Sequence, residues 1–203
     1  MDSNLTNQVV AADFSFHRKP FNMTMPDGFD TYLMRWQTDG RCRARIDDEL
    51  ALVEAGDLLI FPPGQFYELR IDDEVNAMGE LTIESGDYHI FFKGPWADAW
   101  WKSKKRPSKI RVPIEERYLS LFRQIVLEQR RVSNPYPEIS DYTARILCLE
   151  VDRLLSEQPT TTPKTYLAYR MKNYIEENAS SMFKLEDVAV HVGISVSRAV
   201  HLF

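Results

Sequence analysis

Short apolar runs separated by turn residues make up the chain from residue 9 to residue 93. The runs that show this best are Tyr32–Trp36, Cys42–Ile46, Leu50–Val53 and Phe66–Ile71. Many short strands at near-regular spacing, joined by short turns, predict an all-β sandwich or barrel for this part of the chain. The alternation of apolar and polar residues within the runs is imperfect, which indicates that both faces of the strands are partly covered.

Beyond residue 113 the apolar residues recur with the 3.6-residue period of a helix. Residues 114–132 form one amphipathic pattern, and after a proline-containing break at 134–138 a second pattern runs from Ser140, a suitable N-cap, to about Leu155. We predict a helical hairpin, with its second helix as the surface of a homodimer. That helix carries apolar residues outside its inward face, namely Tyr142, Ile146 and Leu149.

Residues 158–164, Gln-Pro-Thr-Thr-Thr-Pro-Lys, have the composition of a linker and mark a predicted domain boundary. Helical patterns follow at 165–178 and 185–192, and a third helix is predicted to start at Val196. The three residues Gly193–Ser195 join the last two helices, which is the layout of a helix-turn-helix. Gly193 supplies the positive φ that the turn needs, and Ser195 caps the helix that follows.

Composition and charge narrow the class of protein. The 203 residues are 44% hydrophobic and 27% charged, as in globular proteins, and the first twenty lack the apolar stretch of a secretion signal. Cys42 and Cys148 stand far apart without metal-ligand spacing, which favours reduced thiols and a cytoplasmic protein. No apolar run approaches the roughly 20 residues of a membrane helix, so no membrane segment is expected.

The net charge of −5 is spread unevenly along the chain. Residues 1–112 hold 14 basic and 18 acidic side chains, whereas residues 164–203 hold 5 basic and 4 acidic ones. Nucleic-acid binding draws most of its affinity from basic side chains at phosphates, so charge alone predicts a poor DNA binder. One dense basic cluster stands out, and a solvated loop is its favoured interpretation: Lys102, Lys104, Lys105, Arg106, Lys109 and Arg111.

Two stretches resemble AraC-type transcription regulators. The residues from Phe183 to Phe203 are similar to the first helix-turn-helix of that family, and Ala55–Gly64 is similar to the turn and strand of its cupin-like sensor domain. The resemblance implies a mixed α and β fold: a cupin-like β-barrel (double-stranded β-helix, or jelly roll), a helical hairpin and a partial helix-turn-helix. The implied domains are a ligand-sensing barrel with an N-terminal arm (1–112), a dimerisation hairpin (113–157), a linker (158–164) and an incomplete DNA-binding domain (165–203).

The same resemblance implies roles for the last helix. Ser197, Val200 and His201 would face base edges, and Arg198 would lie near a phosphate. Because the sequence stops at Phe203, inside the first recognition helix, we expect this chain to lack most of the DNA-binding domain. Specific DNA binding is then expected only of a longer parent chain.

Metal-dependent catalysis is a weaker hypothesis. Metal-binding cupins carry ligand histidines where this chain has Gln65–Leu69, and there only Glu68 is of a metal-binding type. We therefore expect no catalytic residues, no metal and no cofactor. The alternatives left open are a small-molecule cupin enzyme such as a sugar isomerase, which a bound metal would reveal, and an oligomerisation module without sensing.

The effector site is predicted from strand alternation together with the resemblance. Period two puts His89 and Phe91 on one strand face and Tyr67 and Leu69 on another. The effector is expected to be a sugar or a related small molecule, with an arm at about residues 5–20 folding over it. The predicted ligand-binding residues are Arg35, Tyr67, Leu69, His89 and Phe91. Core positions for His89 and Phe91 are the alternatives, and for Arg35 a solvent-facing position is favoured over a ligand contact.

Overall fold

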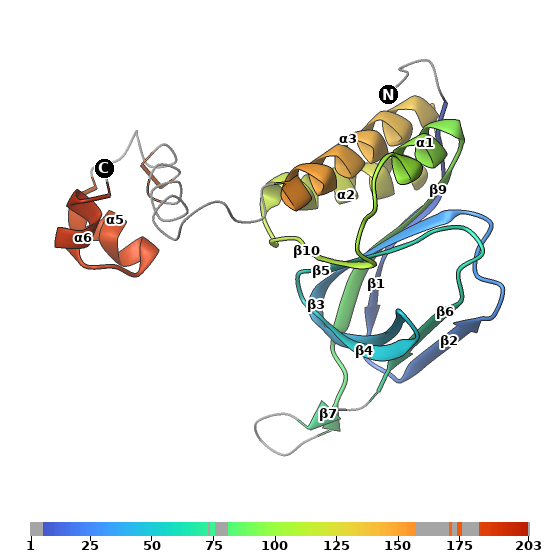
Figure 1. The fold of residues 1–203 in the computed structure, drawn as a ribbon, viewed down its shortest axis with the longest axis horizontal. Coiled ribbons are helices and arrows are strands. Elements are labelled where there is room, and N and C mark those ends of the chain that lie inside the picture. The colour runs from blue at the N-terminus through green and yellow to red at the C-terminus, as the bar shows by residue number, and fades with distance from the viewer. Residues whose placement is uncertain are drawn as a thin grey trace. The chain divides into compact units, whose positions relative to one another are not determined.

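The computed structural model describes residues 6–72, 74–75, 81–156, 171, 174–175 and 183–202. The chain divides into two compact units, Met1–Asp152 and Arg153–Phe203. The first unit combines an antiparallel sheet with helices, and the described residues of the second include the short helices α5 and α6 (Figure 1). The predicted mixed α and β class is therefore confirmed.

The strands of the first unit are β1 (Gln8–His17), β2 (Phe21–Met25), β3 (Tyr32–Ile46), β4 (Glu49–Glu54), β5 (Asp57–Phe61), β6 (Tyr67–Ile71), β7 (Glu74–Val75), β8 (Leu81–Thr82), β9 (Ser85–Lys93) and β10 (Lys109–Arg111). Eight of them form one open antiparallel sheet, and β7 pairs separately with β8.

The long strand β3 organises the sheet. Its first part pairs with β9 and β5, which gives the strand order β1-β9-β3-β5-β10. Its second part, Arg41–Ile46, pairs with β4, and β6 links this region to β2. The strand thus belongs to two groups of strands, which curve away from each other in the lower half of Figure 1.

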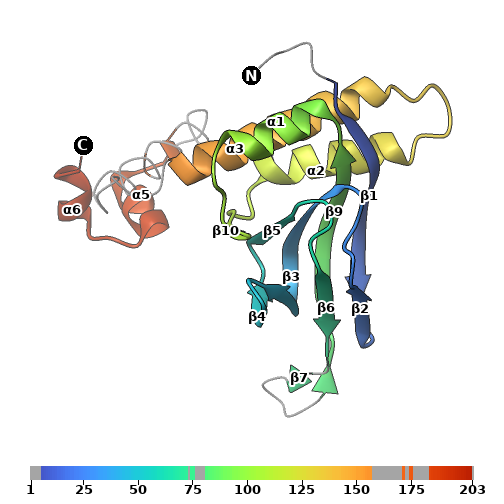
Figure 2. The ribbon, with the colours of Figure 1, turned by 45° about the vertical axis from the view of Figure 1, so that its right-hand side comes forward.

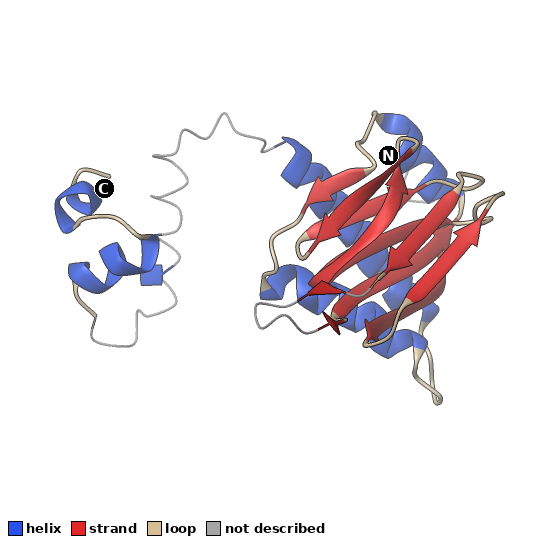
Figure 3. Cartoon of the chain, turned by 90° about the horizontal axis from the view of Figure 1, so that it is seen from below, coloured by secondary structure: helices blue, strands red, loops and turns tan. Residues whose placement is uncertain are grey.

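Three helices cover one face of the sheet: α1 (Pro95–Ser103), α2 (Glu116–Gln129) and α3 (Pro137–Ser156) (Figure 3). Phe122 of α2 lies with its ring centroid 5.1 Å from Trp36 of β3 and 5.6 Å from Tyr88 of β9. The two helices predicted from the 3.6-residue period are present, and the second starts earlier than predicted because proline fits the first turn of a helix. Figure 2 shows α2 and α3 side by side above the strands.

Most of the N-terminal segment that we predicted to fold over the effector as an arm, at about residues 5–20, lies in a strand of the sheet. Gln8–His17 is the edge strand β1, and it pairs with β9 along its whole length. Arg130, just after α2, forms an ion pair with Asp13 and so ties this edge strand to the helices. These backbone and side-chain bonds hold the segment in the sheet.

The second unit contains α5 (Leu185–Val192) and α6 (Val196–Val200). Gly193 has φ 72°, and Ser195 Oγ accepts a hydrogen bond of 3.3 Å from the Arg198 N–H. The predicted turn glycine and N-cap are thus confirmed. In the predicted helix at 165–178, Met171, Tyr174 and Ile175 are helical, whereas its other residues and the predicted linker lie outside the described residues. Within the described ranges, no helix is both long and apolar enough to span a bilayer.

Candidate functional site

The sheet face opposite the helices holds an apolar cluster. Leu33 of β3 packs there with Phe61, and Tyr67 and Leu69 of β6 lie in the same cluster almost without exposure. Phe91 of β9 is partly buried against it, and its ring centroid lies 5.0 Å from that of Phe29. Successive residues of a strand point to opposite faces of the sheet. On the same strands, Tyr32, Trp36 and Tyr88 therefore lie on the other face, where they contact helix residues.

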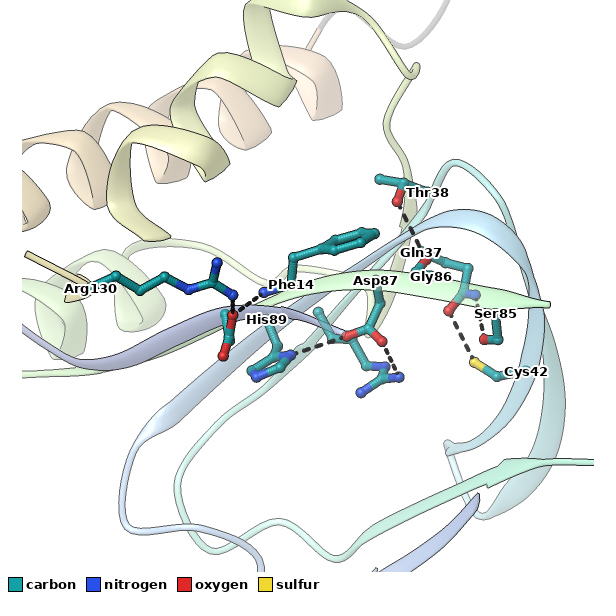
Figure 4. A network of polar contacts seen from close by, with 11 residues as sticks. Phe14, Gln37, Thr38, Cys42, Ser85, Gly86, Asp87, His89 and Arg130 are labelled. Carbon is teal, nitrogen blue, oxygen red and sulfur yellow. Dashed lines mark hydrogen bonds and ion pairs between the residues drawn. The ribbon is translucent and has the colours of Figure 1, made fainter. Parts of the chain in front are cut away.

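A buried ion pair lies beside this cluster (Figure 4). Arg35 Nη2 donates to Asp87 Oδ1 at 2.7 Å, and the Arg35 guanidinium lies close enough to Tyr67 for its charge to act on the pKa of the Tyr67 hydroxyl. Asp87 is fully buried and Arg35 is 7% exposed. The favoured interpretation of Arg35 as solvent-facing is therefore wrong: it shares its strand face with Leu33, and Asp87 compensates the charge that burial would otherwise penalise.

His89 completes the polar group. Its Nδ1 lies 3.2 Å from Asp87 Oδ2, so the aspartate bridges the arginine and the histidine. The structure brings together four of the five predicted ligand residues directly, since Arg35 contacts Tyr67, and the His89 ring lies 6.0 Å from the ring of Phe91. Leu69 lies in the same cluster as Tyr67.

The neighbouring phenol and thiol carry no charge at neutral pH. Burial raises the pKa of the Tyr67 hydroxyl to about 12, although the Arg35 charge opposes this. Burial likewise raises the pKa of the Cys42 thiol to about 11. Formal charge on this part of the face therefore comes from the Arg35–Asp87 ion pair and not from the phenol or the thiol.

Two hydrogen-bonding positions in this group remain unused. Arg35 Nε is buried and has no hydrogen-bond partner among the described residues. His89 contacts the Asp87 carboxylate through Nδ1, so its other ring nitrogen, Nε2, takes no part in this contact. The unpartnered donor Arg35 Nε and the His89 ring thus belong to two side chains held by the same aspartate.

The rest of the polar network is satisfied internally. Gln37 Nε2 donates to Ser85 Oγ at 2.8 Å, and the Cys42 thiol donates to Gln37 Oε1 at 3.3 Å. Buried polar groups normally find such partners, since an unmade bond costs about 1–3 kcal/mol. Among the described residues, both polar atoms of the Asn7 amide, Arg35 Nε and Trp36 Nε1 are buried without a partner, and Arg35 Nε is the one that belongs to this network.

Metal ligands do not gather in the described residues: no group of three or more His, Cys, Asp or Glu side chains could hold an ion there. Glu68, the metal-type residue noted in the sequence, belongs to a different arrangement. Its carboxylate binds Arg45 at 2.7 Å and Arg70 at 2.6 Å. These two guanidinium groups hold the pKa of Glu68 below its usual value.

No protein-family model matches the sequence, and no curated protein matches it. Solved structures do match. ToxT from Vibrio cholerae is 11% identical, with 98% of this chain and 93% of that chain covered and a TM-score of 0.41. The AraC-like transcriptional activator CuxR is 17% identical, with 98% and 69% covered and a TM-score of 0.39. A putative EutQ protein from Salmonella typhimurium is 15% identical, with 43% and 68% covered and a TM-score of 0.28.

CuxR is described as AraC-like, which is the family that the two sequence stretches resemble. The identities are low, so the function of this chain is argued below from its own residues.

The predicted DNA-contacting residues share the exposed side of α6. Ser197, Arg198, Val200 and His201 are all exposed, whereas Ala199 is buried in the small core of the second unit. Sequence reasoning missed Asp87, the residue that holds Arg35 and His89. Its signal was available, because Asp87 stands two residues before His89 and so shares its strand face.

Proposed function

We propose that this chain is the effector-sensing and dimerising part of an AraC-type transcription regulator and has no enzymatic activity. Its first unit acts as a cupin-like sensor (residues 1–112) followed by a dimerisation hairpin (113–157), and a linker (158–164) leads to part of a DNA-binding domain (165–203). The effector contacts Arg35, Tyr67, Leu69, His89 and Phe91. The observation that carries this proposal is the buried guanidinium of Arg35, whose Nε has no partner.

The chemistry of the group favours a hydroxylated effector such as a sugar. A hydroxyl accepts from Arg35 Nε, and a second hydroxyl donates to His89 Nε2. Phe91 offers an aromatic ring for the C–H side of a sugar ring, and Tyr67 and Leu69 supply apolar contact. Asp87 already neutralises the Arg35 guanidinium, so the pair offers no net positive charge to a carboxylate, which favours neutral sugars over acids.

A thermal-shift screen tests the effector site. The panel contains pentoses, hexoses, uronic acids and an unsaturated fatty acid, the ligand class named for one ToxT structure. An effector at about 100 times its dissociation constant stabilises the unit by roughly 2.7 kcal/mol, which raises the midpoint by several degrees. We expect a neutral sugar to do this in wild type, and His89→Phe to remove most of the response because it deletes the acceptor.

The matched control is His201→Phe, the same substitution on the exposed end of α6. This variant is expected to respond as wild type does. A full response in His89→Phe would count against the proposed site. A response to the fatty acid alone would count against the proposed effector class.

The exposed apolar residues of helix α3 support the proposed homodimer. Tyr142, Ile146 and Leu149 are 61%, 48% and 52% exposed, and Ile139 precedes them in the same row. Their alternating spacing of three and four residues is that of a coiled-coil seam. Together with exposed Leu127 of α2 they form an apolar strip that a second copy of the chain would cover.

Ile146→Glu is expected to weaken the dimer at least about tenfold, because a twofold interface contains the substitution twice. Sedimentation velocity across micromolar concentrations measures this. Val190→Glu, on exposed α5, introduces the same charge elsewhere and is expected to leave the dimer intact. A monomeric wild type at these concentrations would refute the interface.

The exposed side of α6 supports the remaining part of the proposal. In a chain with a complete DNA-binding domain, Ser197, Val200 and His201 face base edges and Arg198 approaches a phosphate. A recognition helix presents its early residues to the major groove in this way.

A further inference from the structure

The segment from Lys102 to Lys109, here called the basic loop, concentrates positive charge on a net acidic unit. It contains five basic residues and no acidic one. Lys102, Lys104, Lys105 and Lys109 are exposed. In the described part of the chain, Lys104 and Lys109 have acidic partners at 3.2 and 3.5 Å, whereas no ion pair is found for Lys102 or Lys105.

Arg106 makes the loop rigid, contrary to its interpretation as a freely solvated residue. Its side chain is fully buried and binds both carboxylate oxygens of Asp152, at 2.8 and 2.9 Å. It also donates to the carbonyl oxygens of Trp101 and Lys104, each at 3.1 Å. These bonds fix the backbone of the loop around the Arg106 guanidinium, and the exposed lysines extend from this fixed backbone.

The residue that Arg106 binds, Asp152, lies at the end of the first unit. Asp152 is the last residue of that unit, and the chain continues from it into the unit that contains α5 and α6. Besides Arg106, the Asp152 carboxylate accepts from Trp100 Nε1 at 3.1 Å. The basic loop is thus bonded to α3 four residues before that helix ends.

We propose that the basic loop is a second DNA-contacting surface, in which Lys102 and Lys105 bind backbone phosphates without reading sequence. Charge complementarity selects a polyanion, and DNA is the polyanion that the predicted helix-turn-helix of the same chain would bring. The choice of DNA as the partner rests on the proposed function, in which the chain carries part of a DNA-binding domain. Phosphate contacts of this kind add affinity and orientation and carry no base specificity.

The test uses the 203-residue chain and a fluorescein-labelled 30-base-pair duplex of arbitrary sequence, with binding followed by anisotropy between about 20 and 100 mM salt. The double variant Lys102→Gln/Lys105→Gln is expected to bind at least about tenfold more weakly at the lowest salt. The slope of log affinity against log salt is expected to fall by about two, one for each lost phosphate contact.

The control Arg18→Gln/Lys19→Gln removes two exposed positive charges from the turn between β1 and β2 and is expected to keep the wild-type slope. An equal loss in this control would mean that net charge alone matters, and would overturn the proposal. Absence of wild-type binding at the lowest salt would overturn it too. So would lysine-dependent binding to phosphatidylglycerol vesicles without DNA binding, which would assign the loop to a membrane surface.

The variant Arg198→Gln separates this inference from the proposed function. We expect both the loop variant and Arg198→Gln to bind more weakly than wild type. If only the loop variant loses affinity, the basic loop stands and the helix-turn-helix part of the proposed function fails. If only Arg198→Gln loses affinity, the loop proposal fails.

Discussion

Replacing Arg106 by methionine is expected to lower the free energy of unfolding of the first unit by about 3 kcal/mol, the lower end of the cost of breaking a buried ion pair. All five N–H groups of the guanidinium donate hydrogen bonds, to Asp152, Trp101, Lys104 and Ser103. The guanidinium carbon also lies 4.0 Å from the centroid of the Trp100 ring. Methionine fills much of the volume but leaves Asp152 with fewer partners and two carbonyl groups unpaired.

The loss stays near 3 kcal/mol because Asp152 keeps Trp100 and Lys104 as donors. Arg117→Met is the matched control. Arg117 binds Glu150 at 2.6 Å, but its side chain is 43% exposed, so the loss there is expected to remain below about 1 kcal/mol. All four tryptophans lie in the first unit, so urea unfolding followed by tryptophan fluorescence reports on that unit alone. Equal losses in the two variants would contradict the buried role of Arg106.

The features predicted correctly from the sequence are those set by neighbours along the chain. Gly193 opens its turn and Ser195 caps its helix through groups no more than three residues away. The faces of β6 and β9 follow from the two-residue period of a strand in the same way. Such local rules require no knowledge of what packs against the segment.

The features predicted wrongly depend on partners far along the chain. Arg35 is buried because Asp87, 52 residues later, neutralises it, and Arg106 is buried because Asp152 lies 46 residues later. The sequence alone does not show which acidic residue will pair with a basic one. A basic residue is therefore predicted to face solvent, since burying its charge without a partner is costly. The N-terminal segment is a similar case, because only its pairing with β9 distinguishes a strand from an arm.

Gly40→Ala is the second substitution with a large expected effect, a loss of about 2–5 kcal/mol. Gly40 lies in β3 opposite Ser85, next to Arg41, where pairing with β4 begins. Its φ of 58° is left-handed, which costs a residue with a Cβ roughly 1–2 kcal/mol. A Cβ at this position would also overlap the backbone carbonyl oxygen of Glu84, and a backbone atom cannot move aside as a side chain can. Relieving such overpacking adds about 1–3 kcal/mol.

Gly64→Ala separates these two costs. Gly64 also has a left-handed φ, 75°, but a Cβ there would meet nothing within 4 Å. Its expected loss is the conformational cost alone, about 1–2 kcal/mol, in the same urea experiment. The difference between the two variants therefore measures how firmly β9 and the residues before it hold β3 at its change of partners. If Gly40→Ala lost no more than Gly64→Ala, β3 would be free to shift there. The position of Arg35, five residues earlier on the same strand, would then be less strictly fixed than its bond to Asp87 indicates.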